Sequence, residues 1–353
     1  MAYTTINKST DHFNTKLYTG TGSSNAITGV GFQPDWVWIK NRTTTATNHR
    51  ITDAVRGVTK EIYSDLNAAE GTNSQGLTAF GTDGFTVGNN NDYNQNGNNI
   101  VSWNWKAGGG QGSSNTDGSI NTTYTSVNTT AGFSISSYTG TGSTATVGHG
   151  LGVVPKMIII KKLNATKDWR IYHASVGNTK QLFLNDTGGA DTDSTIWNNT
   201  SPTSSVFTIG TNGGANDSAS NYVAYCFAEK TGYSKFGSYN GNGNADGTFI
   251  YTGMKPTFLL VKKYSASGQS YYIYDSKRDG INQGNGSSGC NRSLRPNTNE
   301  AEEQASGYAM DILSNGFKWR NNNTQQNASG DTYIYMAIGQ TLVGSNNVPC
   351  TAR

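Results

Sequence analysis

The sequence predicts an all-β protein made of three tandem antiparallel β-sandwich domains that are related by an internal repeat. The repeat is the first observation, because an apolar run follows a proline and ends at a lysine six positions later at residues 34–40, 155–161 and 256–262. Composition is the second, since only 14% of the 353 residues are charged while 44 are glycine and 19 are tyrosine. The third is the series of short apolar runs between Gly and Asn turns, which is typical of sandwiches.

The first unit is expected to cover residues 1–107. Asp83 and Gly84 form a hairpin-type turn signal, and the alternation of apolar and polar residues before Lys106 has the period of a half-buried strand. Residues 66–77 are small and polar and are expected to form a loop. In chain order, the expected strands are 17–22 with its glycine-rich turn, 36–39, 50–53, 60–63, 85–88 and 100–105.

The second and third units repeat this plan at residues 131–230 and 231–353. Residues 108–130 are rich in Gly, Ser, Thr and Asn and have little to bury, which predicts an inter-domain linker. The third unit carries an insertion near 276–289 and the one expected helix, at 300–313. A small barrel or a set of propeller blades is the alternative architecture.

The strand at 36–39 is expected to be covered on both faces. Trp36 and Trp38 lie two positions apart and share one face, while Val37 and Ile39 share the other. The aliphatic pair is the natural core of the sandwich. Both faces are apolar in all three copies, as in strands that are buried on both sides. The second cover is therefore a long loop, the next copy or another subunit.

Two features of the sequence are candidate binding or assembly surfaces. The first is the set of tryptophans Trp36, Trp38, Trp103 and Trp105, which alternate with other residues in their strands. One set of rings is expected to lie in a core and the other to face a neighbouring subunit or a glycan. Packing in a core or between subunits is the simpler interpretation.

The second feature is an Asn-rich loop before each closing strand, since loops at one end of a sandwich often carry specificity. A Ca²⁺ ion takes about six to eight oxygen ligands, usually with several carboxylates, and each loop has a single acidic residue. No metal is therefore expected, and a solvated loop is the simpler interpretation. The loops are 89–99, 211–221 and 321–332, and their acidic residues are Asp92, Asp217 and Asp331.

The sequence contains no constellation that would make the protein an enzyme. Its four histidines fall at unrelated places in the repeats, without a nucleophile or carboxylate partner at a catalytic spacing. His173 aligns with Asp53 and Asp275 at a strand end, where we expect a solvated polar residue. No catalytic residue, cofactor or metal site is therefore expected.

Charge and hydropathy exclude two further classes of partner. The net charge is +3 without a Lys/Arg cluster, so no nucleic-acid binding is expected. No apolar run approaches the roughly 20 residues that span a bilayer. The first residues lack the basic and apolar regions of a signal peptide, so synthesis in a cytoplasm is expected.

Three stretches of the first unit resemble one known family. They are the first nine residues (MAYTTINKS), residues 31–42 (GFQPDWVWIKNR) and residues 102–109 (SWNWKAGG). They look like the tandem β-domain virion structural proteins of marine tailed phages, the cyanophages and pelagiphages, which are often tail-fibre-like. The second unit departs from the pattern at Lys156, which replaces Asp35, and the third keeps only the outline. The resemblance implies a virion component and transfers no catalytic residue.

The expected function is that of a phage virion structural protein of the tail-fibre or host-attachment type. It would be located in the virion after synthesis in the host cytoplasm. Its expected partners are other virion proteins, in a homo-oligomer or with capsid or tail subunits, and a host surface glycan. A capsid decoration protein is the alternative, and a carbohydrate-binding or polysaccharide-degrading module is a third hypothesis.

Overall fold

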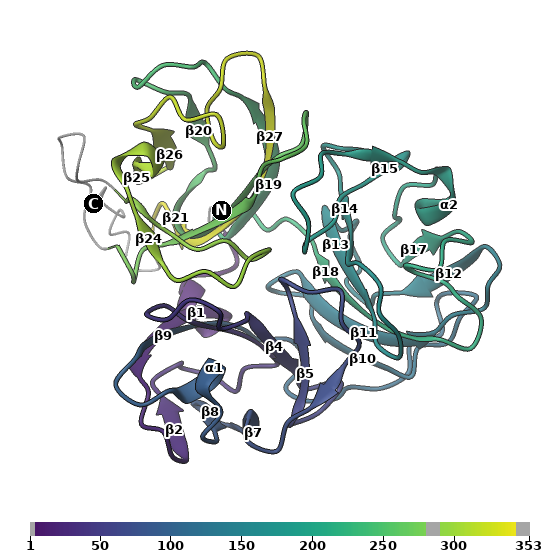
Figure 1. Cartoon of the computed structure of the whole chain (residues 1–353). Coiled ribbons are helices and arrows are strands. Elements are labelled where there is room, and N and C mark those ends of the chain that lie inside the picture. Colours follow the sequence, from purple (N-terminus) through teal and green to yellow (C-terminus); the bar gives the residue numbers. More distant parts are fainter. Residues whose placement is uncertain (1–3, 280–289, 344–353) are drawn as a thin grey trace.

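The computed structural model describes residues 4–279 and 290–343, and nearly all of their regular structure is β (Figure 1). The strands of the main sheets pair in antiparallel fashion, and each sheet is open. The all-β, antiparallel class expected from the sequence is therefore confirmed. No helix within the described ranges is long and apolar enough to cross a membrane.

Unit 1 (residues 4–107) opens with a 3₁₀ helix, η1 (Ser9–Asp11), and contains a short helix, α1 (Asn91–Asn94). Its strands form a six-stranded sheet, β1-β9-β3-β4-β5-β6, and a three-stranded sheet, β2-β8-β7. The strands are β1 (Phe13–Thr19), β2 (Asn25–Thr28), β3 (Trp36–Asn41), β4 (Arg50–Asp53), β5 (Lys60–Tyr63), β6 (Gly71–Thr72), β7 (Leu77–Gly81), β8 (Gly84–Val87) and β9 (Asn99–Trp105).

Unit 2 (residues 108–230) has a five-stranded sheet, β10-β11-β18-β13-β14, the pairs β12-β17 and β15-β16, and a short helix, α2 (Ser194–Trp197). Its strands are β10 (Tyr124–Asn128), β11 (Phe133–Thr139), β12 (Ala145–Gly148), β13 (Met157–Lys162), β14 (Arg170–His173), β15 (Lys180–Gln181), β16 (Asp191–Thr192), β17 (Val206–Ile209) and β18 (Asn221–Phe227).

Unit 3 (residues 231–279 and 290–343) has a four-stranded sheet, β19-β27-β21-β22, a three-stranded sheet, β20-β26-β25, and the pair β23-β24. A 3₁₀ helix, η2 (Ser306–Tyr308), precedes β25. The strands are β19 (Ser234–Asn240), β20 (Phe249–Tyr251), β21 (Met254–Lys263), β22 (Tyr271–Asp275), β23 (Arg292–Ser293), β24 (Glu303–Gln304), β25 (Met310–Leu313), β26 (Gly316–Trp319) and β27 (Thr332–Thr341).

The main sheets of the units share one pairing order. In each unit, the first of the repeated strands pairs with the closing strand. The closing strand pairs with the strand that contains the repeated lysine, called here the proline–lysine strand. That strand pairs in turn with the strand that follows it in the chain. The matching series are β1-β9-β3-β4, β11-β18-β13-β14 and β19-β27-β21-β22. The sequence repeat therefore corresponds to a repeated strand order.

Each unit buries one face of its main sheet against its own smaller sheet. In unit 1, Val37 and Ile39 of β3 pack with Phe85 and Val87 of β8. Equivalent clusters fill unit 2, around Ile158 and Ile160, and unit 3, around Leu259 and Val261. This face is the sandwich core expected for the aliphatic residues of the strand.

The opposite faces of the three main sheets meet in one common core. This cluster contains Trp36 and Trp38 of unit 1, Met157 and Ile159 of unit 2, and further residues of β21 and β27. Figure 1 shows the result as three lobes around a shared centre. The second cover of the proline–lysine strand is therefore the other two copies within the same chain.

Two sequence expectations are corrected here, and one lies outside the described residues. The end of the expected linker forms β10, because Tyr124 to Asn128 pair with β11 as an extra edge strand. The expected helix at 300–313 is replaced by β24, η2 and β25, since β25 finds a partner in β26. Most of the expected insertion, residues 280–289, lies outside the described residues.

Candidate functional site

The repeated lysine of each unit is buried at a junction with another unit. Lys40, Lys161 and Lys262 are each at most 1% exposed. Each ammonium nitrogen donates to a main-chain oxygen of its own unit and to one of a neighbouring unit. The contacts between units are Lys161 with Asn67, Lys262 with Thr187 and Lys40 with Asn299, at 3.1, 3.2 and 3.2 Å.

A main-chain hydrogen bond accompanies each lysine contact. The acceptor of each lysine is a main-chain oxygen in the neighbouring unit. Three positions after that acceptor, a main-chain N–H donates back to the unit of the lysine. It meets the main-chain oxygen of the residue two positions after the lysine. The pairs are Glu70 to Leu163, Ala190 to Tyr264 and Glu302 to Arg42, at 2.8, 2.8 and 2.9 Å. Both contacts recur with the same residue spacing and link unit 2 to 1, 3 to 2 and 1 to 3. The units therefore form a closed ring with a pseudo-threefold relationship.

Burial changes the protonation of these lysines. Desolvation lowers the pKa of Lys40, Lys161 and Lys262 to about 8 in each case. A lysine with a lowered pKa is often a catalytic nucleophile or base. Here each ammonium is hydrogen-bonded to carbonyl oxygens between packed units, so its geometry is that of a structural contact.

The strand-end residues Asp53, His173 and Asp275 form a second set of contacts between units. The hydroxyl of Tyr225 in unit 2 donates to Asp53 at 2.7 Å. The indole N–H of Trp103 in unit 1 donates to Asp275 at 2.9 Å. We expected solvated residues at these positions, and that expectation is wrong, because all three are at most 1% exposed.

The exchange of aspartate for histidine in unit 2 has an electrostatic explanation. Asp53 is paired with Arg56, three positions later, at 2.6 Å, and Arg56 also contacts Glu70. Unit 3 repeats this network with Asp275, Arg278 and Glu302. A carboxylate without its arginine would be a buried, unpaired charge.

Unit 2 lacks the other members of this network. Val176 and Ala190 stand where units 1 and 3 have arginine and glutamate. His173 lies 3.3 Å from the main-chain oxygen of Tyr335 in unit 3. Burial lowers the pKa of His173 to about 4, so the ring is neutral at pH 7. Unit 2 therefore has a neutral histidine in place of the aspartate, because it has no arginine there to compensate a buried negative charge.

All four candidate tryptophans lie in the common core. Trp36, Trp38, Trp103 and Trp105 are at most 1% exposed. Trp36 stacks on Tyr225 of unit 2 with a ring-centre distance of 4.8 Å. The expectation that one set of rings faces another subunit or a glycan is wrong, because the other units of the same chain cover both pairs.

The three candidate aspartates are held in ion pairs within their own units. Asp92 pairs with Arg50, while Asp217 and Asp331 each pair with the lysine directly after the repeated one, at 2.5 Å. The side chains of Asp217 and Asp331 remain 49% and 24% exposed. Their loops stay on the surface, and a binding role for them stays a prediction.

A buried asparagine in each polar loop was missed by sequence reasoning. Asn94, Asn216 and Asn327 are fully buried. Each accepts a hydrogen bond from the middle residue of its unit's glycine-rich turn, at 2.9, 2.7 and 3.0 Å. The signal was available, because each lies seven positions before an aligned apolar residue of the closing strand, which is Val101 in unit 1. These residues fix the loops to the turns.

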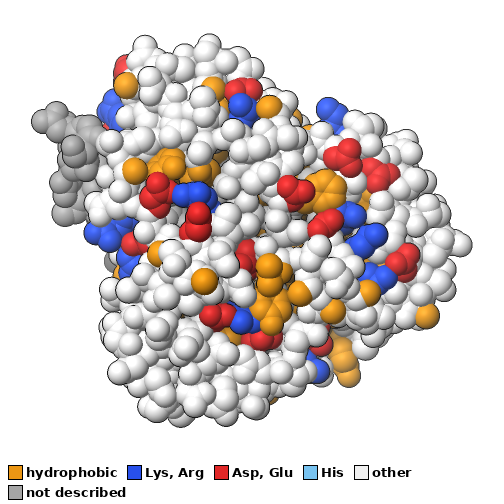
Figure 2. Space-filling view, in the orientation of Figure 1, with side chains coloured by type: hydrophobic (Ala, Val, Ile, Leu, Met, Phe, Trp, Pro, Cys, Tyr) orange, Lys and Arg blue, Asp and Glu red, His pale blue; other side chains and the backbone are white. Residues whose placement is uncertain are grey.

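On the face of the molecule in Figure 2, hydrophobic and charged side chains occupy the smaller part. In Figure 2 the outer rims of the lobes are mostly white, while hydrophobic and charged side chains gather where the lobes meet. Exposed large apolar residues are few among the described residues, and they include two neighbouring pairs, Val153 and Val154 at 40% and 43% exposure and Phe249 and Tyr251 of β20 at 44% and 57%. Small exposed apolar groups of this size are common on the surfaces of folded proteins.

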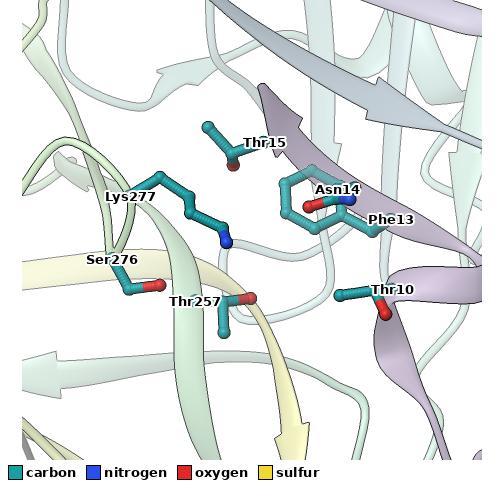
Figure 3. Close-up of a pocket in the computed structure, with 7 residues that line it drawn as sticks. All are labelled: Thr10, Phe13, Asn14, Thr15, Thr257, Ser276 and Lys277. Carbon is teal, nitrogen blue, oxygen red and sulfur yellow. The ribbon is translucent and has the colours of Figure 1, made fainter. Parts of the chain in front are cut away.

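Among the described residues, hollows of different size lie at the junctions, and two of them are considered as sites. A cavity of about 40 Å³ lies between units 1 and 3, and Lys277 reaches over it toward Phe13 and Thr15 (Figure 3). It has room for a few water molecules. A cleft of about 320 Å³ lies between units 1 and 2, with Glu70 on one side and Asn221 on the other. This cleft is the larger of the two and is the candidate binding site.

Within the described ranges, no group of three or more His, Cys, Asp or Glu side chains is placed to hold a metal ion.

The comparisons with known proteins identify a family. The chain belongs to the family described as a domain of unknown function (DUF7483), whose model matches residues 8–341. That match covers all three units as one domain. No curated protein and no solved structure matches the chain.

Proposed function

We propose that the chain is a structural protein of a tailed-phage virion, of the tail-fibre or host-attachment type, that presents its loops to other virion proteins or to a host surface. The observation that carries this proposal is the closed ring of buried contacts. Lys40, Lys161 and Lys262 are used to join the units rather than to do chemistry. The resemblance of residues 31–42 and 102–109 to marine phage proteins gives the setting.

The polar surface supports the same role. A displayed protein must remain soluble at high local density, and here the rims of the lobes carry uncharged polar groups. The glycine-rich turns and Asn-rich loops are fixed to each other by Asn94, Asn216 and Asn327. Fixed loops lose little conformational entropy on binding, which favours recognition of a surface. The chain needs no catalytic activity for this task.

Capsid decoration is the second candidate, and the pseudo-threefold ring favours it. A single chain with three related junctions presents three related faces, which suit a threefold position of a shell. Its partners would then be capsid subunits, and its loops would point away from them.

Cryo-electron microscopy of purified particles, with the protein located by an antibody fragment, tests the proposal. The fragment should label the tail or its fibres if the first candidate is right and the capsid shell if the second is right. Particles that carry no copy of the chain would overturn both. A sugar-release assay on host polysaccharide tests the enzyme hypothesis separately, and we expect no release.

A further inference from the structure

The cleft between units 1 and 2 has a wall that the other junctions lack. Gln111, Thr123 and Tyr124 come from the segment before β11; Thr123 directly precedes β10 and Tyr124 is its first residue. Units 1 and 3 have no counterpart of β10 in their described sheets. The extra strand therefore gives one of three related junctions a different shape.

Several polar groups of this cleft are not committed to protein partners. The amide nitrogen of Gln111 donates to the main-chain oxygen of Val55 at 3.1 Å, which leaves its carbonyl oxygen open. Within residues 4–279 and 290–343, the structure shows no hydrogen bond for the hydroxyls of Thr123 and Tyr124. The hydroxyl of Ser137, directly opposite Tyr124 in β11, is buried without a partner there. The carbonyl oxygen of Gln111 and the hydroxyls of Thr123 and Tyr124 are therefore available for a polar ligand.

The charges around the cleft cancel. Arg56 is paired with Asp53 and with Glu70, and Lys60 lies 3.8 Å from the other oxygen of Glu70. Two cations therefore face two carboxylates, and no unpaired charge is left for a phosphate, sulfate or carboxylate. The ligand that fits is neutral.

The lining of the cleft also has an apolar part. Tyr124 and Leu163 are half-buried and pack against the common core, so their positions are fixed. A volume of about 320 Å³ lies at the lower end of small-molecule sites. Sugars combine hydroxyl groups with apolar C–H faces, and they bind where fixed aromatic rings lie beside open hydrogen-bonding groups.

We propose that the cleft between units 1 and 2 binds one or two rings of a neutral saccharide through Gln111, Thr123, Tyr124 and Asn221. The inference rests on the host-attachment form of the proposed function and names its ligand class. The other two junctions have no such role.

The experiment is binding of the full chain to an array of neutral hexose and N-acetylhexosamine oligosaccharides, followed by calorimetry on the best probe. Thr123→Trp fills the cleft from an exposed position, where the main-chain bond to Ser137 is kept. Gln111→Ala and Tyr124→Phe each remove one polar group. Tyr251→Phe, at a 57% exposed tyrosine of unit 3, is the matched control.

The wild type and Tyr251→Phe should bind equally, Thr123→Trp should lose binding, and the other two variants should weaken it about tenfold. Equal binding by all variants would overturn the cleft as the site while leaving host attachment possible elsewhere. A preference for sulfated or acidic saccharides would overturn the neutral ligand class. If no saccharide binds, the cleft proposal fails, and the position of the chain in the particle still decides the proposed function on its own.

Discussion

The ammonium nitrogen of Lys161 lies 3.1 Å from the main-chain oxygen of Asn67, 94 positions earlier in the chain. This contact joins unit 2 to unit 1, and its counterparts close the ring. A buried ammonium that meets only carbonyl oxygens is stabilised by hydrogen bonds but penalised by desolvation. The balance between these two effects can be measured.

The free energy of unfolding should rise as the pH increases from 7 to 9. Desolvation lowers the pKa of Lys40, Lys161 and Lys262 to about 8 in the folded chain, against the ordinary 10.5. Between these values the unfolded state holds more protons than the folded state, so stability increases with pH. Each lysine should contribute on the order of 1 kcal/mol by pH 9.

Urea unfolding at pH 7, 8 and 9 measures this rise. Lys161→Met removes one of the three groups, so its rise should be about a third smaller than that of the wild type. The range stops at pH 9 because burial raises the pKa of tyrosines such as Tyr233 and Tyr271, which act in the opposite direction near pH 10. Stability that does not change with pH in the wild type would contradict this account of the lysines.

Asp275→Asn should destabilise the chain far more than His173→Asn at the equivalent position. The first change removes the closer of the two carboxylates that Arg278 pairs with and leaves the buried guanidinium with Glu302 alone, which costs about 3–5 kcal/mol. The second removes one neutral contact to Tyr335 and should cost about 1–2 kcal/mol. Equal losses in thermal or urea unfolding would mean that the Asp–Arg network is not what distinguishes the junctions.

Trp36→Ala should lower the free energy of unfolding by about 3–5 kcal/mol, because the indole is fully surrounded by the common core. Tyr251→Ala is the control at an exposed aromatic position and should change stability by less than about 0.5 kcal/mol. Both variants should keep the oligomeric state of the wild type in light scattering. A Trp36 variant that altered assembly but not stability would place the ring on an outer surface.

The sequence predicts the local structure well where the residue pattern within a single strand is enough to indicate it. The apolar faces of the strand around Trp36 and Val37 indicated cover on both sides. What covered the second face could not be predicted, because that partner lies on strands about 100 or more positions away. Asp53 looked like a solvated strand end for the same reason, since its partner Tyr225 lies 172 positions away in another unit.

Two local errors have a common physical cause. Residues 124–128 are polar enough to look like linker, and they become β10 only because β11 offers an edge. The charged, Ala-containing stretch at 300–313 has helical propensity, but its end pairs with β26 and becomes β25. In both cases pairing with distant residues outweighed the local preference. The candidate cleft was missed because its lining comes from several short segments that lie far apart in the sequence, from Val55 to Tyr222.

The central claim is that the three units form one body around a common core. Hydrogen exchange of the full chain at increasing, sub-denaturing urea, resolved by mass spectrometry, tests it most directly. Peptides from β3, β13 and β21 should approach the same opening free energy, because each strand is buried by the other units as well as by its own. Exchange of one unit at a clearly lower free energy, with the other two still protected, would contradict the claim.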